Sequence, residues 1–78
     1  MLNFDLYAIE TTDDERHSSI KEFFTSFEEA KENRFKYAHW CYPKGYVAIA
    51  KYNANNSFLC SHTWYLNPEG NILEEYNF

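Results

Sequence analysis

Two short motifs in this sequence contain cysteine and histidine, residue types that can bind a metal ion or take part in catalysis. His39 and Cys41 form one motif, and Cys60 and His62 form its mirror image. Residues two apart on a strand project from the same face, so two neighbouring strands could present both thiolates and both imidazoles to one zinc ion. Paired zinc ligands are usually separated by about two to four residues rather than one. The competing interpretation makes both cysteines small buried apolar residues, and we expect no metal and no other cofactor.

The same residues could form a cysteine nucleophile with a histidine base. Such a pair also needs an orienting group and a site that stabilises an oxyanion. The chain contains only two glycines, both expected in turns, so no glycine-rich loop is available. A disulfide between Cys41 and Cys60 is disfavoured in a reducing compartment. We therefore predict that the protein is not an enzyme.

Aromatic side chains interleaved with basic ones are a second candidate site. The rings considered are Trp40, Tyr42, Tyr46, Tyr52, Trp64, Tyr65 and Tyr76, and the basic residues among them are Arg34, Lys36, Lys44 and Lys51. Bases of single-stranded nucleic acid stack on such rings when cations hold the backbone. The competing expectation is that most rings fill a small core. Rings that stay exposed, Trp40 and Tyr42 among them, would instead anchor a protein partner.

Acidic side chains are concentrated in the first half of the chain. Eight of the twelve Asp and Glu residues lie between positions 10 and 32, whereas positions 34–58 hold four basic residues and no acid. Such a patch can attract a basic protein surface, although a solvated loop and helix face would also explain it. The predicted partner-binding residues are Glu10, Asp13, Asp14, Glu15, Glu28, Glu29, Trp40 and Tyr42.

Length and composition limit the classes of protein that fit. The chain has 78 residues, a mass of 9.4 kDa and a net charge of −5, which predicts one domain spanning residues 1–78. It has no apolar run of about 20 residues that could span a membrane, and no signal-peptide pattern at its start. A cytoplasmic location is therefore the expectation. The negative charge disfavours direct binding to nucleic acid.

Alternating and continuous apolar patterns predict four strands separated by turns. The expected strands are Leu2–Glu10, Tyr46–Tyr52, Phe58–Leu66 and Asn71–Phe78. The expected loop and turns are Thr11–His17, Tyr42–Gly45, Asn53–Ser57 and Asn67–Gly70. The strand over Tyr46–Tyr52 is almost continuously apolar, which is typical of a central strand.

The start of the single expected helix is ambiguous. A capping box at Ser19 would begin a helix there, whereas one at Ser26 would begin it at Phe27 and leave Ile20–Phe24 as the end of a strand. Both interpretations predict helix over at least Phe27–Asn33, and the later start would carry it to about Ala38.

These elements predict an α+β fold with one helix packed on an antiparallel sheet of four or five strands. On this fold, the acidic and aromatic residues favour a small protein-binding domain that docks on a basic surface of a partner protein. The size and acidity are similar in kind to those of phage inhibitors of host defence. A zinc-binding module and a weak single-strand nucleic-acid binder are the alternatives.

Overall fold

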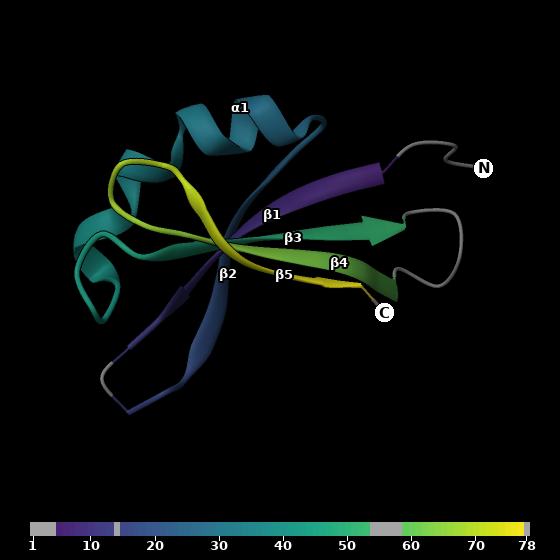
Figure 1. Cartoon of the computed structure of the whole chain (residues 1–78). Helices are drawn as coiled ribbons and strands as arrows, with labels where there is room; N and C mark the ends of the chain where they lie inside the picture. The colour runs from purple at the N-terminus through teal and green to yellow at the C-terminus, as the bar shows by residue number, and fades with distance from the viewer. Residues whose placement is uncertain (1–4, 14, 54–58, 78) are drawn as a thin grey trace.

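Within the residues that the structure describes, five antiparallel strands form one sheet in the order β2-β1-β3-β4-β5 (Figure 1). The strands are β1 (Asp5–Thr12), β2 (Ser18–Phe24), β3 (Val47–Asn53), β4 (Leu59–Leu66) and β5 (Ile72–Asn77). The computed structural model describes residues 5–13, 15–53 and 59–77 of the chain. The α+β class and the antiparallel sheet are confirmed, and β3 lies at the centre, as its apolar sequence predicts.

The first hairpin differs from the sequence-based expectation. The predicted loop over residues 11–17 is wrong at its start, because β1 continues to Thr12. Thr11 and Thr12 pair with Ser19 and Ser18 of β2, and the β-branched threonines suit an extended backbone. Residues 2–4 of the first predicted strand, and most of the turn predicted over residues 53–57, lie outside the described residues.

The helix begins at the later of the two predicted starts. α1 covers Phe27–Glu32, and the hydroxyl of Ser26 accepts a hydrogen bond from the backbone N–H of Glu29 at 3.1 Å. A start at Ser19 is wrong, because Ser18–Phe24 is strand β2. The extension toward residue 38 is also wrong.

The chain after α1 continues in two short 3-10 turns. Asn33 ends α1 with φ −93° and ψ 0°, and its side chain donates to the carbonyl of Glu29 at 2.8 Å. The turns η1 (Arg34–Lys36) and η2 (Ala38–Trp40) follow. The backbone N–H of Asn33 is shared between the carbonyls of Glu29 at 3.1 Å and Ala30 at 3.2 Å, and such three-centre bonds are common where a helix tightens into 3-10 turns at its end.

Removing the N-cap hydroxyl should destabilise the protein. We expect Ser26→Ala to lower the free energy of unfolding by about 1 kcal/mol, because the N–H of Glu29 would lose its partner. Urea unfolding followed by circular dichroism measures the change. Ser26→Asp keeps an acceptor oxygen and should remain close to the wild type. Equal losses in the two variants would contradict the capping role.

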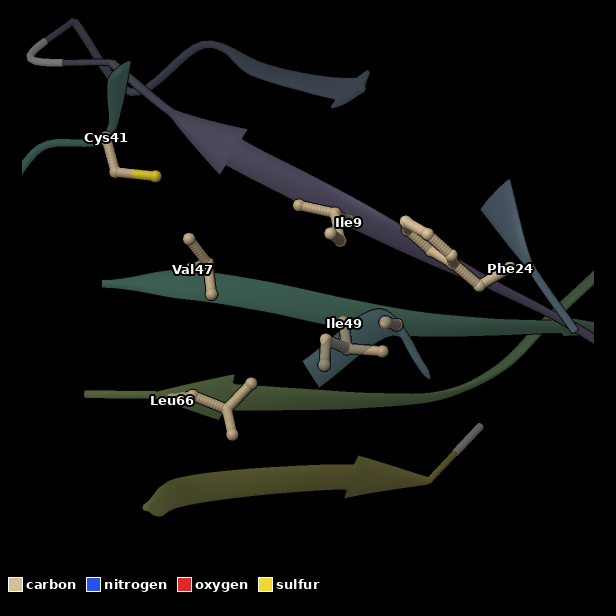
Figure 2. Packing of buried hydrophobic residues seen from close by; sticks show 7 residues of the cluster. Ile9, Phe24, Cys41, Val47, Ile49 and Leu66 are labelled. Carbon is tan, nitrogen blue, oxygen red and sulfur yellow. The ribbon is translucent and has the colours of Figure 1, made fainter. Parts of the chain in front are cut away.

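The buried core is mainly aliphatic and lies on one face of the sheet. Figure 2 shows Ile9, Val47, Ile49 and Leu66 projecting from the three neighbouring strands β1, β3 and β4, with Phe24 and Cys41 beside them. Ala30 of α1 belongs to the same cluster. The rings packed at its margin are Tyr7, Phe27, Tyr37 and Trp64.

The expectation that most aromatic rings fill the core is wrong. The exposed rings are Phe23, Phe35, Trp40, Tyr42, Tyr46, Tyr65 and Tyr76. The strands place small or aliphatic side chains at the centre of the sheet, for example Ile49 and Ala50, both with no exposed area. Large rings therefore occupy the ends and edges, where part of each ring remains in water.

Candidate functional site

Tyr42 and the turn between β1 and β2 lie next to each other, although thirty positions separate them in the sequence. The backbone N–H of Tyr42 donates to the carbonyl of Thr12 at 2.7 Å. Tyr42, Asp13 and Arg16 line one hollow of the surface, and Tyr42 is 64% exposed. Two of the predicted partner-binding residues, Asp13 and Tyr42, therefore share one surface.

The carboxylate of Asp13 organises the turn. It accepts the backbone N–H groups of Glu15 at 2.9 Å and His17 at 2.8 Å, and the His17 ring lies 3.4 Å away. The hydrogen bond from the His17 N–H is the largest cause of the lowered pKa of Asp13. Asp13 thus has a structural role here, while Glu15 beside it is exposed. Asp14 lies outside the described residues.

Glu10 is tied to the sheet by a neighbouring phenol. The Tyr52 hydroxyl donates to Glu10 at 3.3 Å. Burial, followed by the negative charge of Glu10, raises the pKa of Tyr52 to about 12. The phenol therefore stays protonated and remains a donor at neutral pH.

The remaining predicted site residues lie apart from the β1–β2 turn or have other neighbours. Glu28 and Glu29 occupy the first turn of α1, where negative charge favours the helix dipole. α1 lies at the top of Figure 1 and the β1–β2 turn at the lower left. Trp40 is 61% exposed, and the Lys21 ammonium lies 5.4 Å from its ring centre. The predicted acidic site is thus divided between two parts of the molecule.

A groove runs beside Tyr42. It consists of two adjoining spaces with volumes of about 340 and 550 Å³. Both spaces are lined by Thr12, Tyr42, Pro43 and Tyr65. The smaller is mostly apolar and is also lined by Tyr46, Val47, Ala48, Leu66, Leu73 and Glu74, and the larger by Asp13, Arg16 and Ser18.

Tyr46 and Tyr65 belong to the aromatic candidate set that the sequence offers, but neither is among the predicted partner-binding residues, and Leu73 is in neither set. The alternation of side chains along β4 does predict that Tyr65 lies on the opposite face of the sheet from Trp64 and Leu66. Its place on that face could therefore be read from the sequence. Leu73 carried no such signal, because it lies at an irregularity of register between β4 and β5. Tyr46 immediately precedes β3 and follows the turn that ends at Gly45.

The cysteines and histidines of the zinc alternative have separate environments. Cys41 is buried, its thiol contacts the carbonyl of Tyr37 at 3.6 Å, and burial raises its pKa. The Cys60 thiol contacts the carbonyl of His62 at 3.6 Å. The His39 ring lies against Trp40. Among the described residues, no three His, Cys, Asp or Glu side chains form a group able to hold a metal ion.

His62 instead belongs to a cluster with Trp64 and Glu75. The His62 and Trp64 rings stack with centres 4.0 Å apart. The Trp64 indole donates to Glu75 at 2.6 Å, and His62 Nε2 lies 2.9 Å from the same carboxylate oxygen. Interaction with His62, then with Trp64, lowers the pKa of Glu75.

This cluster should make stability depend on acid pH. The pKa of Glu75 is lower in the folded state than its ordinary value of 4.5. The ionised carboxylate therefore contributes fully to the free energy of unfolding above about pH 4.5, and this contribution is lost as the pH falls through the folded-state pKa. We expect His62→Phe, which keeps a stacked ring but removes the nitrogen, to raise the pKa of Glu75 toward 4.5. Carboxyl ¹³C chemical shifts during an acid titration measure this. An unchanged midpoint would contradict the interaction.

The basic residues of the middle segment do not form one cationic strip beside the exposed rings. Arg34 is buried. The Lys51 ammonium lies 3.4 Å from Asp5, and the Lys36 ammonium lies 4.0 Å from Glu22. Binding of a single-stranded backbone needs cations that track the phosphates, so this arrangement weakens the nucleic-acid alternative.

Comparisons with protein-family models, curated proteins and solved structures find no match for this chain. No helix in the described part of the chain is long and apolar enough to cross a membrane. The β1–β2 turn, Tyr42 and the groove beside them form one continuous surface that could contact a partner.

Proposed function

We propose that this chain is a non-enzymatic domain that docks on a basic surface of a partner protein in the cytoplasm. The observation that carries the proposal is the backbone hydrogen bond from Tyr42 to Thr12, which brings the exposed Tyr42 next to the acidic turn. Exposed tyrosines are frequent affinity anchors at protein interfaces. Nearby carboxylates, within a net charge of −5, accelerate encounter with a basic partner.

The proposal includes a division of the sheet into a covered and an open face. α1 would pack over the face that carries Ile9 and Ile49 and leave the other face available for contact. Support comes from Ala30, which lies in the core cluster with these residues, and from the Phe27 ring, whose centre is 4.8 Å from that of Trp64. Glu28 and Glu29 on α1 would add only to the long-range field.

The specific form of this proposal is an inhibitor encoded by a phage or another mobile element. Carboxylates at the docking surface would take the place of nucleic-acid phosphates on a host protein. Lysines and arginines that bind phosphates also pair with carboxylates, so an acidic domain can occupy such a groove in competition with nucleic acid. The small size and acidity of the chain support this form.

Affinity capture from a bacterial lysate tests the proposal. The Asp14→Asn, Glu15→Gln double variant removes two negative charges at the turn and spares Asp13, which holds the turn together. The Glu28→Gln, Glu29→Gln double variant removes two charges on α1 and is the matched control. Mass spectrometry identifies and quantifies captured proteins at several salt concentrations.

The expected result is capture of a basic protein that weakens with salt and weakens more in the turn variant than in the α1 variant. Nucleic acid added to the lysate should compete with this capture. Equal capture by the wild type and both variants at all salt concentrations would refute acidic docking at the turn.

A further inference from the structure

The sheet face that carries Ala48 has a floor of small side chains. By strand register, Ala8 lies opposite Ala50 and Ala50 opposite Thr63, while Ala48 lies opposite Tyr65. All three alanines and Thr63 are buried. This floor is low compared with the rings beside it, so the face is not flat.

Aromatic pairs border this floor on two sides. Phe23, opposite Ala8, makes an edge contact with Tyr52 at a ring-centre distance of 6.1 Å. Tyr65 and Tyr76 make a second edge contact at 5.8 Å. The smaller space of about 340 Å³ opens beside the second pair, over Ala48.

The walls of this space present apolar surface to solvent. Tyr42, Tyr46, Tyr65 and Leu73 line it, and each is more than 40% exposed. The volume is near the lower end of the range of about 300–1,000 Å³ seen in ligand sites. An open apolar space of this size, with aromatic walls, is suited to a large side chain from another protein.

Charges around the groove favour a basic occupant. Glu74 lines the apolar space and accepts a hydrogen bond from Tyr76 at 2.9 Å. Among the described residues its carboxylate has no second hydrogen bond or ion pair, so it can accept from a further donor. Asp13 and Arg16 line the adjoining space, and Glu10 lies on the same sheet face as Ala48. Carboxylates therefore outnumber cations among these described groups. A second copy of the chain would bring like charges together, which disfavours it as the occupant.

We propose that the groove binds an amphipathic segment of the partner protein, with a large apolar side chain over Ala48 and a lysine or arginine beside Glu74. The Tyr42 and Tyr65 rings pack against the apolar side chain of the partner, and the carboxylate of Glu74 pairs with its lysine or arginine. This inference rests on the proposed function and adds the chemistry of the segment recognised.

A synthetic peptide of alternating leucine and lysine is the probe. Two control peptides share its length: one replaces lysine by glutamate, and the other replaces leucine by serine and keeps the charge. Amide and methyl chemical shifts of the labelled full chain locate binding, and peptide fluorescence anisotropy gives the affinity. The leucine–lysine peptide should shift Ala48, Tyr65 and Leu73 and bind at least about tenfold more tightly than either control.

Three substitutions separate the groove from general charge attraction. Tyr65→Ser should weaken binding about tenfold or more, as for a central interface ring. Glu74→Gln should weaken the leucine–lysine peptide a few-fold, as for a partly exposed ion pair. Phe35→Ser removes a ring that is 63% exposed outside the groove and should leave the affinity unchanged. Circular dichroism confirms that each variant is folded.

The outcomes distinguish this inference from the proposed function. Equal binding of the leucine–lysine and serine–lysine peptides would contradict binding in the groove and leave acidic docking intact. Chemical-shift changes confined to residues 15–17 of the turn would do the same. No binding of the leucine–lysine peptide at millimolar concentration would also overturn the groove. Concentration-dependent self-association that Tyr65→Ser abolishes would show that a second copy of the chain, and not a partner segment, occupies the groove. Groove binding without any salt-sensitive capture from lysate would instead refute the proposed function alone.

Discussion

Ile49→Ala should remove a large part of the stability of this domain, about 2–5 kcal/mol of the free energy of unfolding. Ile49 has no exposed area, lies in the central strand β3, and pairs with Ile9 on one side and Trp64 on the other. The loss combines the transfer of apolar groups with the cavity that a rigid sheet cannot close. A chain of this length is stable by about 4–12 kcal/mol, so the substitution would remove a large fraction of the total and lower the unfolding temperature.

Ile72→Ala is the matched control for this prediction. Ile72 lies in the edge strand β5 and is 49% exposed, so the same substitution should cost less than about 1 kcal/mol. Urea unfolding monitored by tryptophan fluorescence and circular dichroism gives both values. Losses of similar size at the two positions would mean that the core is not organised around β3.

Gly70→Ala should also be strongly destabilising, lowering the free energy of unfolding by about 2–3 kcal/mol. Gly70 has φ +87°, where a residue with a Cβ is strained. A Cβ there would lie 2.7 Å from Nη2 and 2.9 Å from Cζ of Arg34. Arg34 is only 8% exposed, and its Nη1 donates to the carbonyl of Lys31 at 2.7 Å. The guanidinium would have to leave this position or force the turn open.

The Arg34→Met background separates the two causes. Methionine keeps an apolar stem but lacks the guanidinium that the new methyl group would meet. In that background, Gly70→Ala should cost only about 1 kcal/mol from the backbone strain. A double-mutant cycle from thermal unfolding measures the difference as the interaction between the two sites. Additive losses would show that Arg34 does not limit the space at Gly70.

Most of the sheet could be predicted from sequence because its signals are local. The apolar run of β3 indicated a central strand, and Asn67 to Gly70 carried the turn residues that join β4 to β5. Gly70 closes that turn with an N–H bond to the carbonyl of Asn67 at 2.9 Å. The capping serine at position 26 was also visible, although Ser19 offered a similar pattern and only pairing with β1 decided between them.

Features that depend on long-range contacts could not be predicted in this way. The burial of Arg34 depends on a turn more than thirty residues later, which a helical pattern does not reveal. The sequence predicts Asp13 and Tyr42 as partner-binding residues for separate reasons, but the backbone bond from Tyr42 to Thr12 that brings them together links distant segments. The grouping of Tyr65 and Leu73 around the same groove likewise depends on strand order and register.

The strand order has a consequence for how the chain folds. β1 and β2 form a hairpin, and β3, β4 and β5 form a meander of consecutive strands. A single seam joins them, where β1 pairs with β3 from Asp5 opposite Asn53 to Glu10 opposite Ala48. Of the strand pairings in the sheet, this one has the largest entropic cost of loop closure, since the paired residues are far apart in sequence. We expect the hairpin and the meander to form early and the pairing of β1 with β3 to set the folding rate. Until that pairing forms, the edges of β1 and β3 are unpaired and can also pair with another chain.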